Sequence, residues 1–141
     1  MKLGLAFTAL LVSTVLLSAA APSATVTYIG HDKVAKGGTL LSAPDLTVMI
    51  IHRASPGEVE VHDKETDTFY ILDGAATLVT GGTMNGGKVT APDQHRGKSI
   101  TGGETRQLTK GDVVVIPAGI PHWFKEVPRS IDYYVVKVLK P

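Results

Sequence analysis

Short apolar or alternating segments, separated by glycine-rich turns, follow one another along the chain from Leu46 onward. The segments with the pattern of a β-strand are Leu46–His52, Glu58–His62, Asp67–Leu72, Ala76–Thr80, Asp112–Pro117 and Asp132–Leu139. Short strands at regular spacing with turn residues between them are typical of an antiparallel sandwich or barrel. One helical turn is expected at His31–Lys36, ended by Gly37 and Gly38. The pattern therefore predicts an all-β domain.

The turns predict how some of these strands connect. The stretch Gly57–Gly74 has the pattern of a β-hairpin. Asp73-Gly74 separates two apolar segments, and glycine tolerates the positive φ of a tight turn. A hairpin between Asp67–Leu72 and Ala76–Thr80 is therefore expected.

The stretch Gly81–Gly103 is polar and rich in glycine. We expect it to form a long hairpin excursion, with weak strands around Val89 and Ile100. There is no internal repeat and no composition typical of an interdomain linker. One domain is therefore expected over residues 25–141.

The first 24 residues have a different composition. A single charge, Lys2, precedes an uncharged, mostly apolar run over Leu3–Leu17, and small residues follow over Ser18–Ala24. This order is typical of a secretory signal peptide, with cleavage expected between positions 19 and 24. An uncleaved membrane anchor is the alternative, because the run approaches the roughly 20 residues that span a bilayer. The protein is expected to be exported, periplasmic or secreted, and free of the membrane after signal removal.

Charge and cysteine content narrow the function classes. The formal net charge is +1, and it falls to zero when Lys2 is removed with the leader. A nearly neutral chain with scattered basic residues gives no electrostatic reason to expect nucleic acid as a partner. The chain has no cysteine, so it forms no disulfide and offers no thiolate to a metal.

Two segments carry residues suited to chemistry. In Glu58–His62, Glu60 and His62 are neighbours on one face, because strand side chains alternate. That face is either solvated or able to chelate an ion. In the second segment, Pro117, Gly119 and Pro121 lead into His122 and restrict the backbone there. Such a rigid mount favours a ligand role for the histidine.

The second segment resembles the second motif of the cupin superfamily. That motif is a glycine, five residues, Pro-x-Gly, two residues, a histidine, three residues and an asparagine. Gly111, Pro117, Gly119 and His122 match it at each spacing. Glu126 stands at the asparagine position, which is a departure from the pattern.

The first segment is similar to the first cupin motif, with substitutions. His62 falls on the second histidine of the motif, four residues precede Asp67, and six more lead to Gly74. Glu60 replaces the first histidine, Asp67 replaces the glutamate, and Ala54 stands at the initial glycine. The resemblance covers the chain from about residue 46 to 139.

The resemblance implies a jelly-roll β-barrel with ligand positions in its mouth. The implied metal ligands are Glu60, His62, Asp67 and His122, where the family usually has three histidines and one glutamate. Mixed imidazole and carboxylate ligation suits Zn, Mn, Fe or Ni. The two carboxylates would neutralise a divalent ion and weaken it as a Lewis acid. Alternatively, Asp67 reaches the ion only through water, or caps the start of its strand.

Two functions follow from the implied site. The first is a metal-dependent enzyme acting on a small polar molecule, by lyase, isomerase or oxygenase chemistry, with Glu60 as ligand or as general base. The second is a non-catalytic barrel that binds a small molecule or the metal itself. A homodimer is a further expectation, built on the apolar strands Leu46–Ile51 and Tyr133–Leu139.

Overall fold

A computed structural model of the protein describes residues 25–140. The predicted signal peptide, residues 1–24, lies outside the described residues. The elements are α1 (His31–Ala35), β1 (Gly38–Ser42), β2 (Leu46–Arg53), β3 (Val59–His62), β4 (Glu65–Thr80), β5 (Thr83–Asn85), β6 (Lys88–Ala91), β7 (Gln94–Gly97), β8 (Ser99–Thr101), β9 (Glu104–Thr109), β10 (Val113–Ile116), β11 (His122–Glu126) and β12 (Ile131–Leu139). All six predicted strand segments coincide with strands, and the predicted helical turn is α1.

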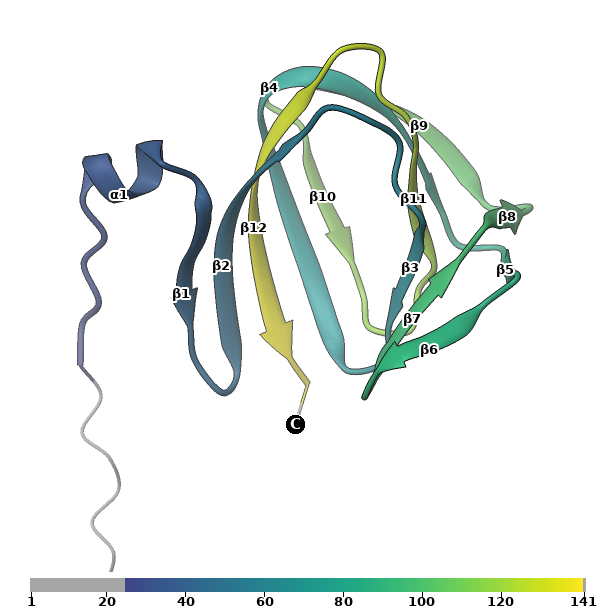
Figure 1. Ribbon diagram of the computed structural model, residues 1–141, viewed down its shortest axis with the longest axis horizontal. Helices are drawn as coiled ribbons and strands as arrows, with labels where there is room; N and C mark the ends of the chain where they lie inside the picture. The colour runs from purple at the N-terminus through teal and green to yellow at the C-terminus, as the bar shows by residue number, and fades with distance from the viewer. Residues whose placement is uncertain (1–24, 141) are drawn as a thin grey trace, which may run out of the picture.

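The strands form a curled antiparallel sheet that closes into a barrel. Its main path runs β1-β2-β12-β4-β11-β3-β7-β6, with β9 and β10 also paired to β4, and β5 pairs with β8 separately. Figure 1 shows β2, β12 and β10 on one side, facing β11, β3 and β7 on the other. The long strand β4 belongs to both sides. The predicted all-β jelly-roll barrel is confirmed.

The hairpin expected at Asp73-Gly74 is wrong. The chain continues through this point as one 16-residue strand, β4. Gly74 does have a positive φ of 79°. That conformation serves a bulge instead of a reversal, since the register between β4 and β12 shifts beside it. Residues before the bulge pair with β10 and residues after it pair with β9 and β11, so the bulge turns the strand from one side of the barrel to the other.

The hairpin expected over Gly57–Gly74 is also wrong. Strand β3 pairs with β7 and β11, and β4 pairs with β9, β10, β11 and β12. The expected excursion over Gly81–Gly103 is confirmed as two nested pairs, β5 with β8 and β6 with β7. Val89 lies in β6 and Ile100 in β8. Because β7 also pairs with β3, the excursion brings its side chains to the mouth of the barrel.

The side chains that face the barrel interior are apolar over most of its length and polar at one end. The apolar core comprises Phe69, Ile71, Ala76, Leu78, Leu108, Ile116, Phe124, Ile131, Tyr133 and Val135. On β12, Tyr133 and Val135 share one face with Lys137, and Lys137 is the cross-strand partner of Asp67 on β4. The inward face of the sheet therefore changes from apolar to charged towards this end. Within the described residues, α1 lacks the length needed to cross a membrane.

Candidate metal centre

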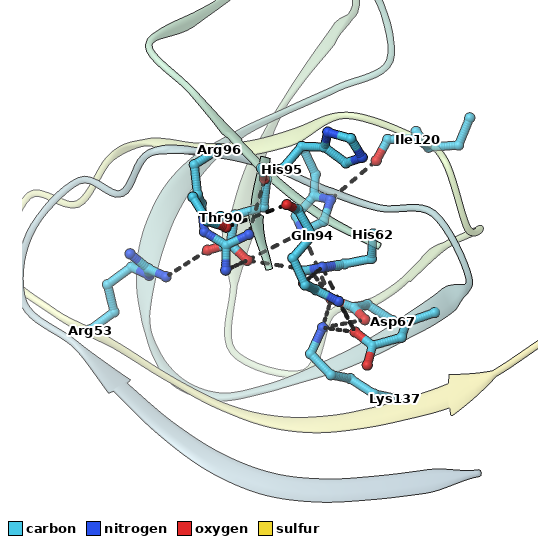
Figure 2. Close-up of polar contacts among 12 residues, drawn as sticks. Arg53, His62, Asp67, Thr90, Gln94, His95, Arg96, Ile120 and Lys137 are labelled. Atoms are coloured by element: carbon cyan, nitrogen blue, oxygen red, sulfur yellow. Dashed lines mark hydrogen bonds and ion pairs between the residues drawn. The ribbon is translucent and has the colours of Figure 1, made fainter. Parts of the chain in front are cut away.

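A cavity of about 230 Å³ opens among side chains from six strands. Its lining residues are Met49, Ile51, Arg53, Glu58, Glu60, His62, Asp67, Phe69, Gln94, Arg96, His122, Phe124, Tyr133, Val135 and Lys137. The four residues expected from the sequence, Glu60, His62, Asp67 and His122, all contribute to it. Figure 2 shows His62, Gln94, Asp67 and Lys137 close together, joined by polar contacts.

His62 lies at the end of β3 and is only 4% exposed. Its Nδ1 is hydrogen-bonded to the side-chain oxygen of Gln94 on β7. An amide oxygen only accepts, so Nδ1 carries the proton and Nε2 has a free lone pair. Nε2 is a buried side-chain atom without a hydrogen-bond partner among the described residues. Buried polar atoms are rarely left unpaired, so this nitrogen is positioned for a ligand.

His122 begins β11 and is 3% exposed. Its Nδ1 donates to the carbonyl oxygen of Ile120 at 3.2 Å, which directs Nε2 towards the cavity. Burial lowers the pKa of His122 below the usual 6.5, although the negative charge of Asp67 partly opposes the shift. His122 is therefore neutral at pH 7, which is the form that binds a metal.

Glu60 lies on β3, two positions before His62, so both side chains are on the same face of the strand. Its Oε2 is 3.4 Å from His62 Nε2 and 4.0 Å from His122 Nε2. Burial by itself would raise the pKa of Glu60, but the contact with His62 and the charge of Arg96 outweigh it and lower the pKa to about 2. Glu60 is therefore ionised at neutral pH.

Asp67 is buried inside β4 and paired with Lys137. The Lys137 Nζ donates to both carboxylate oxygens, at 2.7 and 2.8 Å. Asp67 Oδ2 also lies 3.5 Å from His62 Nε2 and 3.7 Å from His122 Nε2. The contacts of Asp67 are thus with the cavity and not with a turn. The expectation that two carboxylates neutralise a divalent ion changes, because Lys137 already balances one of them.

The separations between the carboxylate oxygens and the imidazole nitrogens are compatible with metal ligation, although no single group of ligand atoms includes both Glu60 and Asp67. A tetrahedral ion with bonds of about 2.1 Å places neighbouring ligand atoms about 3.4 Å apart. The four contacts that Glu60 and Asp67 make with the two Nε2 atoms span 3.4 to 4.0 Å. Two groups could hold an ion, Glu60 with His62 and His122, and His62 with Glu65 and Asp67.

Several residues in or directly beside the cavity are absent from the sequence-based expectation. Lys137 and Glu65 form an ion pair at 3.4 Å, and Glu65 also accepts from Gln94 at 3.2 Å. Arg53 and Arg96 flank Glu60 at 3.9 and 3.6 Å. The position of Lys137 could have been inferred from strand alternation, because it follows the buried Tyr133 and Val135 at intervals of two residues on β12. No comparable pattern in the polar stretch Gly81–Gly103 pointed to Gln94 or Arg96.

Comparison with known families identifies the domain. A model described as the EutQ-like cupin domain matches residues 41–138. The chain belongs to this family. The match covers every residue that lines the cavity, and it leaves α1 outside. No curated protein matches this cupin in sequence.

Solved structures share the fold of this cupin at low sequence identity. BH2720 from Bacillus halodurans has a TM-score of 0.55 at 15% identity, with 86% of each chain covered. The cupin domain of Schizosaccharomyces pombe Cnp3 has a TM-score of 0.53 at 15% identity, covering 74% of this chain and 60% of that chain. This cupin thus spans less than two thirds of the Cnp3 structure. A cupin superfamily protein from Desulfitobacterium hafniense has a TM-score of 0.51 at 14% identity, with coverages of 74% and 76%.

Proposed function

We propose that this cupin binds a divalent metal ion in the mouth of its barrel and acts on a small polar molecule there. The observation that carries the proposal is the unpaired, buried Nε2 of His62. It lies within 3.5 Å of two carboxylates, next to a second imidazole whose Nε2 is also directed into the cavity. Export to the periplasm or outside the cell is part of the same proposal and rests on the apolar leader.

The contacts of the four candidate ligands indicate which of them are best placed to bind a metal. His62 and His122 each have Nδ1 fixed by an oxygen acceptor, which is the arrangement that orients ligating histidines. Glu60 is ionised and borders both. Asp67 is the weakest of the four, because a metal would compete with Lys137 for its oxygens.

The bound ion would supply Lewis-acid polarisation of a carbonyl or hydroxyl oxygen, or redox chemistry if it is iron or manganese. Lyase or isomerase chemistry needs only the former, and oxygenase chemistry needs the latter. The pKa of Glu60, about 2, favours a ligand role over that of general base, since an efficient base has a pKa near the working pH.

A specific observation favours the second candidate, a non-catalytic binding protein. The carboxylates of the cavity are paired with cations, Asp67 with Lys137 and Glu60 with Arg53 and Arg96. The pKa of Glu60, about 2, makes this carboxylate a poor proton acceptor at neutral pH. A barrel of this kind can hold a ligand without transforming it.

Elemental analysis of the native protein tests metal binding, with Glu60→Ala and His122→Ala beside it. We expect about one equivalent of a divalent metal in the native protein and a loss in both variants. His52→Ala is the matched control, because His52 is exposed and pairs with Asp132 outside the cavity. Metal retained in Glu60→Ala would remove Glu60 from the ligand set. Native preparations without metal would overturn the proposal.

Measurement of oxygen uptake distinguishes oxygenase chemistry from lyase or isomerase chemistry. The protein is loaded in turn with zinc, manganese, iron and nickel, and incubated with small hydroxy and keto compounds. Uptake with iron or manganese alone would support oxygenase chemistry. Turnover with zinc and no uptake would support a lyase or isomerase. Binding with no turnover for any metal would favour the non-catalytic candidate.

A further inference from the structure

Two arginine side chains stand at the mouth of the cavity, on either side of Glu60. Arg53 comes from β2 and Arg96 from β7, and these strands lie on opposite sides of the barrel (Figure 1). Their nearest nitrogens are 3.9 and 3.6 Å from the Glu60 oxygens. Both distances exceed that of a hydrogen bond, so Glu60 balances their charge without occupying their donors.

Arg53 is held in place by its surroundings. Its guanidinium lies over the ring of Phe124, 4.9 Å from the centroid, and its Nε donates to the Tyr133 hydroxyl at 3.4 Å. A Cβ at Gly57 would come within 2.5 Å of Arg53 Nη1, so the absence of a side chain there leaves room for the arginine. The indole of Trp123 donates to the Gly57 carbonyl at 2.8 Å and fixes that loop. Arg53 is therefore preorganised, with little entropy to lose on binding.

Most donors of the two guanidinium groups remain available. A guanidinium has five N–H donors. Within the described residues, Arg53 makes one hydrogen bond, to Tyr133, and Arg96 makes one, from Nη1 to the His95 carbonyl at 3.0 Å. Both side chains are about three-quarters buried. Two guanidinium groups with unoccupied N–H donors match the planar pair of oxygens in a carboxylate.

The charge of the cavity also favours an anionic ligand once a metal is bound. Its lining carries three cationic side chains, Arg53, Arg96 and Lys137, and three carboxylates, Glu58, Glu60 and Asp67. Glu65, 3.4 Å from Lys137, adds a fourth carboxylate beside this lining, so three positive and four negative charges leave a formal charge of −1. A divalent ion would leave one positive charge in a partly buried site, which an anionic ligand would offset. This step rests on the proposed function, whereas the free arginine donors do not.

The shape and apolar wall of the cavity limit what that anion is. On β2, Met49, Ile51 and Arg53 face the cavity in succession, so an apolar surface begins directly beside the guanidinium. Phe69 and Val135 extend this surface on β4 and β12. The volume of about 230 Å³ lies below the roughly 300–1,000 Å³ of pockets for drug-sized ligands, so the ligand is small.

We propose that the ligand of this cavity is a small organic carboxylate. Its carboxylate lies between Arg53 and Arg96, and its short apolar part packs on Met49 and Ile51. The unpartnered donors fix the charged end, and the wall of β2 fixes the orientation of the remainder. Inorganic phosphate fits this description poorly, because it has nothing to place on the apolar wall.

Isothermal titration calorimetry tests the proposal with acetate, propionate, isobutyrate and lactate, each on zinc-loaded and chelator-treated full-length protein. Isobutyramide serves as the uncharged counterpart of isobutyrate, and inorganic phosphate as the competing anion. We expect isobutyrate to bind and isobutyramide to show no measurable heat. Arg53→Met and Arg96→Met should each weaken carboxylate binding by roughly 10- to 100-fold. Arg129→Met, an exposed arginine outside the cavity, should leave it unchanged.

Circular dichroism and the fluorescence of Trp123 establish that each variant is folded, and Arg96→Met gives an independent reading if Arg53→Met is not. Equal binding of acid and amide, unchanged affinity in both folded arginine variants, or binding of phosphate alone would overturn the carboxylate site. Zinc binding without binding of any carboxylate would overturn it and leave the metal proposal standing. Arginine-dependent carboxylate binding to a protein that takes up no metal would support it and refute the metal proposal.

Discussion

Replacement of Lys137 by methionine removes the cation that balances a buried carboxylate. Asp67 is 2% exposed, and Lys137 Nζ donates to both of its oxygens. Breaking a buried ion pair by deleting one partner typically costs about 3–5 kcal/mol. Lys137 is 16% exposed, so we expect the lower end of that range. For a domain of this size a loss of about 3 kcal/mol lowers Tm by on the order of 10 °C.

The same substitution should strengthen metal binding. Lys137 competes with an incoming cation for the Asp67 oxygens, and its charge repels that cation. Its removal is therefore expected to raise zinc affinity by about tenfold or more. Thermal unfolding of the chelator-treated protein measures the first effect, and zinc titration with a competing chelator measures the second. Zinc should restore much of the lost stability, because the ion replaces the missing cation.

Two further variants serve as controls for the Lys137→Met substitution. Lys64→Met breaks an exposed pair with Asp93 at 3.1 Å and should change stability by about 1 kcal/mol or less. Lys137→Met combined with Asp67→Asn removes both charges and should regain part of the lost stability. A Lys137→Met variant with unchanged Tm would refute the stabilising pair. Weaker zinc binding in that variant would refute the competition for Asp67.

Three other predictions concern local features of the fold and the site. Gly74→Ala should cost about 3 kcal/mol or more in chemical unfolding, because a Cβ at φ 79° would overlap a backbone carbonyl oxygen. Gly111→Ala, with φ 93° and nothing within 4 Å of its added Cβ, should cost only about 1 kcal/mol, and equal losses would refute the steric reason. Gln94→Ala should weaken metal affinity by roughly 10- to 100-fold, because it frees the His62 ring; unchanged affinity would show that the ring is held otherwise. The folded pKa of Glu60, about 2, lies below 4.5, so its stabilisation is present above pH 4.5 and is lost as pH falls towards 2. Acid titration of Glu60→Gln should therefore lose less stability over that interval than the wild type, and parallel curves would contradict the shift.

Local sequence patterns determined the strands and which neighbouring side chains share a face. Alternation placed Glu60 and His62 on one face of their strand, and the prolines before His122 restricted the backbone where that histidine enters its strand. The spacing of the two segments was sufficient to suggest the cupin family, and the match over residues 41–138 bears this out. These properties are local, because they depend on strand periodicity and turn chemistry within a few residues.

At Gly74 the local sequence is compatible with two backbone structures. A positive φ fits both a tight reversal and a bulge within a continuing strand. Nothing in the neighbouring residues distinguishes them. The decision comes from β12, which pairs with β4 up to Gly74, and from the different partners that β4 has on the two sides of the bulge.

The sequence by itself thus determined an all-β domain and four polar residues at positions suited to a metal. The tertiary structure alone decided what surrounds them. Lys137 meets Asp67 across 70 residues of chain, and Gln94 meets His62 across 32, because strand register brings them opposite each other. Charge balance in a buried site depends on such distant neighbours, since unpaired buried charge is costly and must be compensated wherever the fold places a partner.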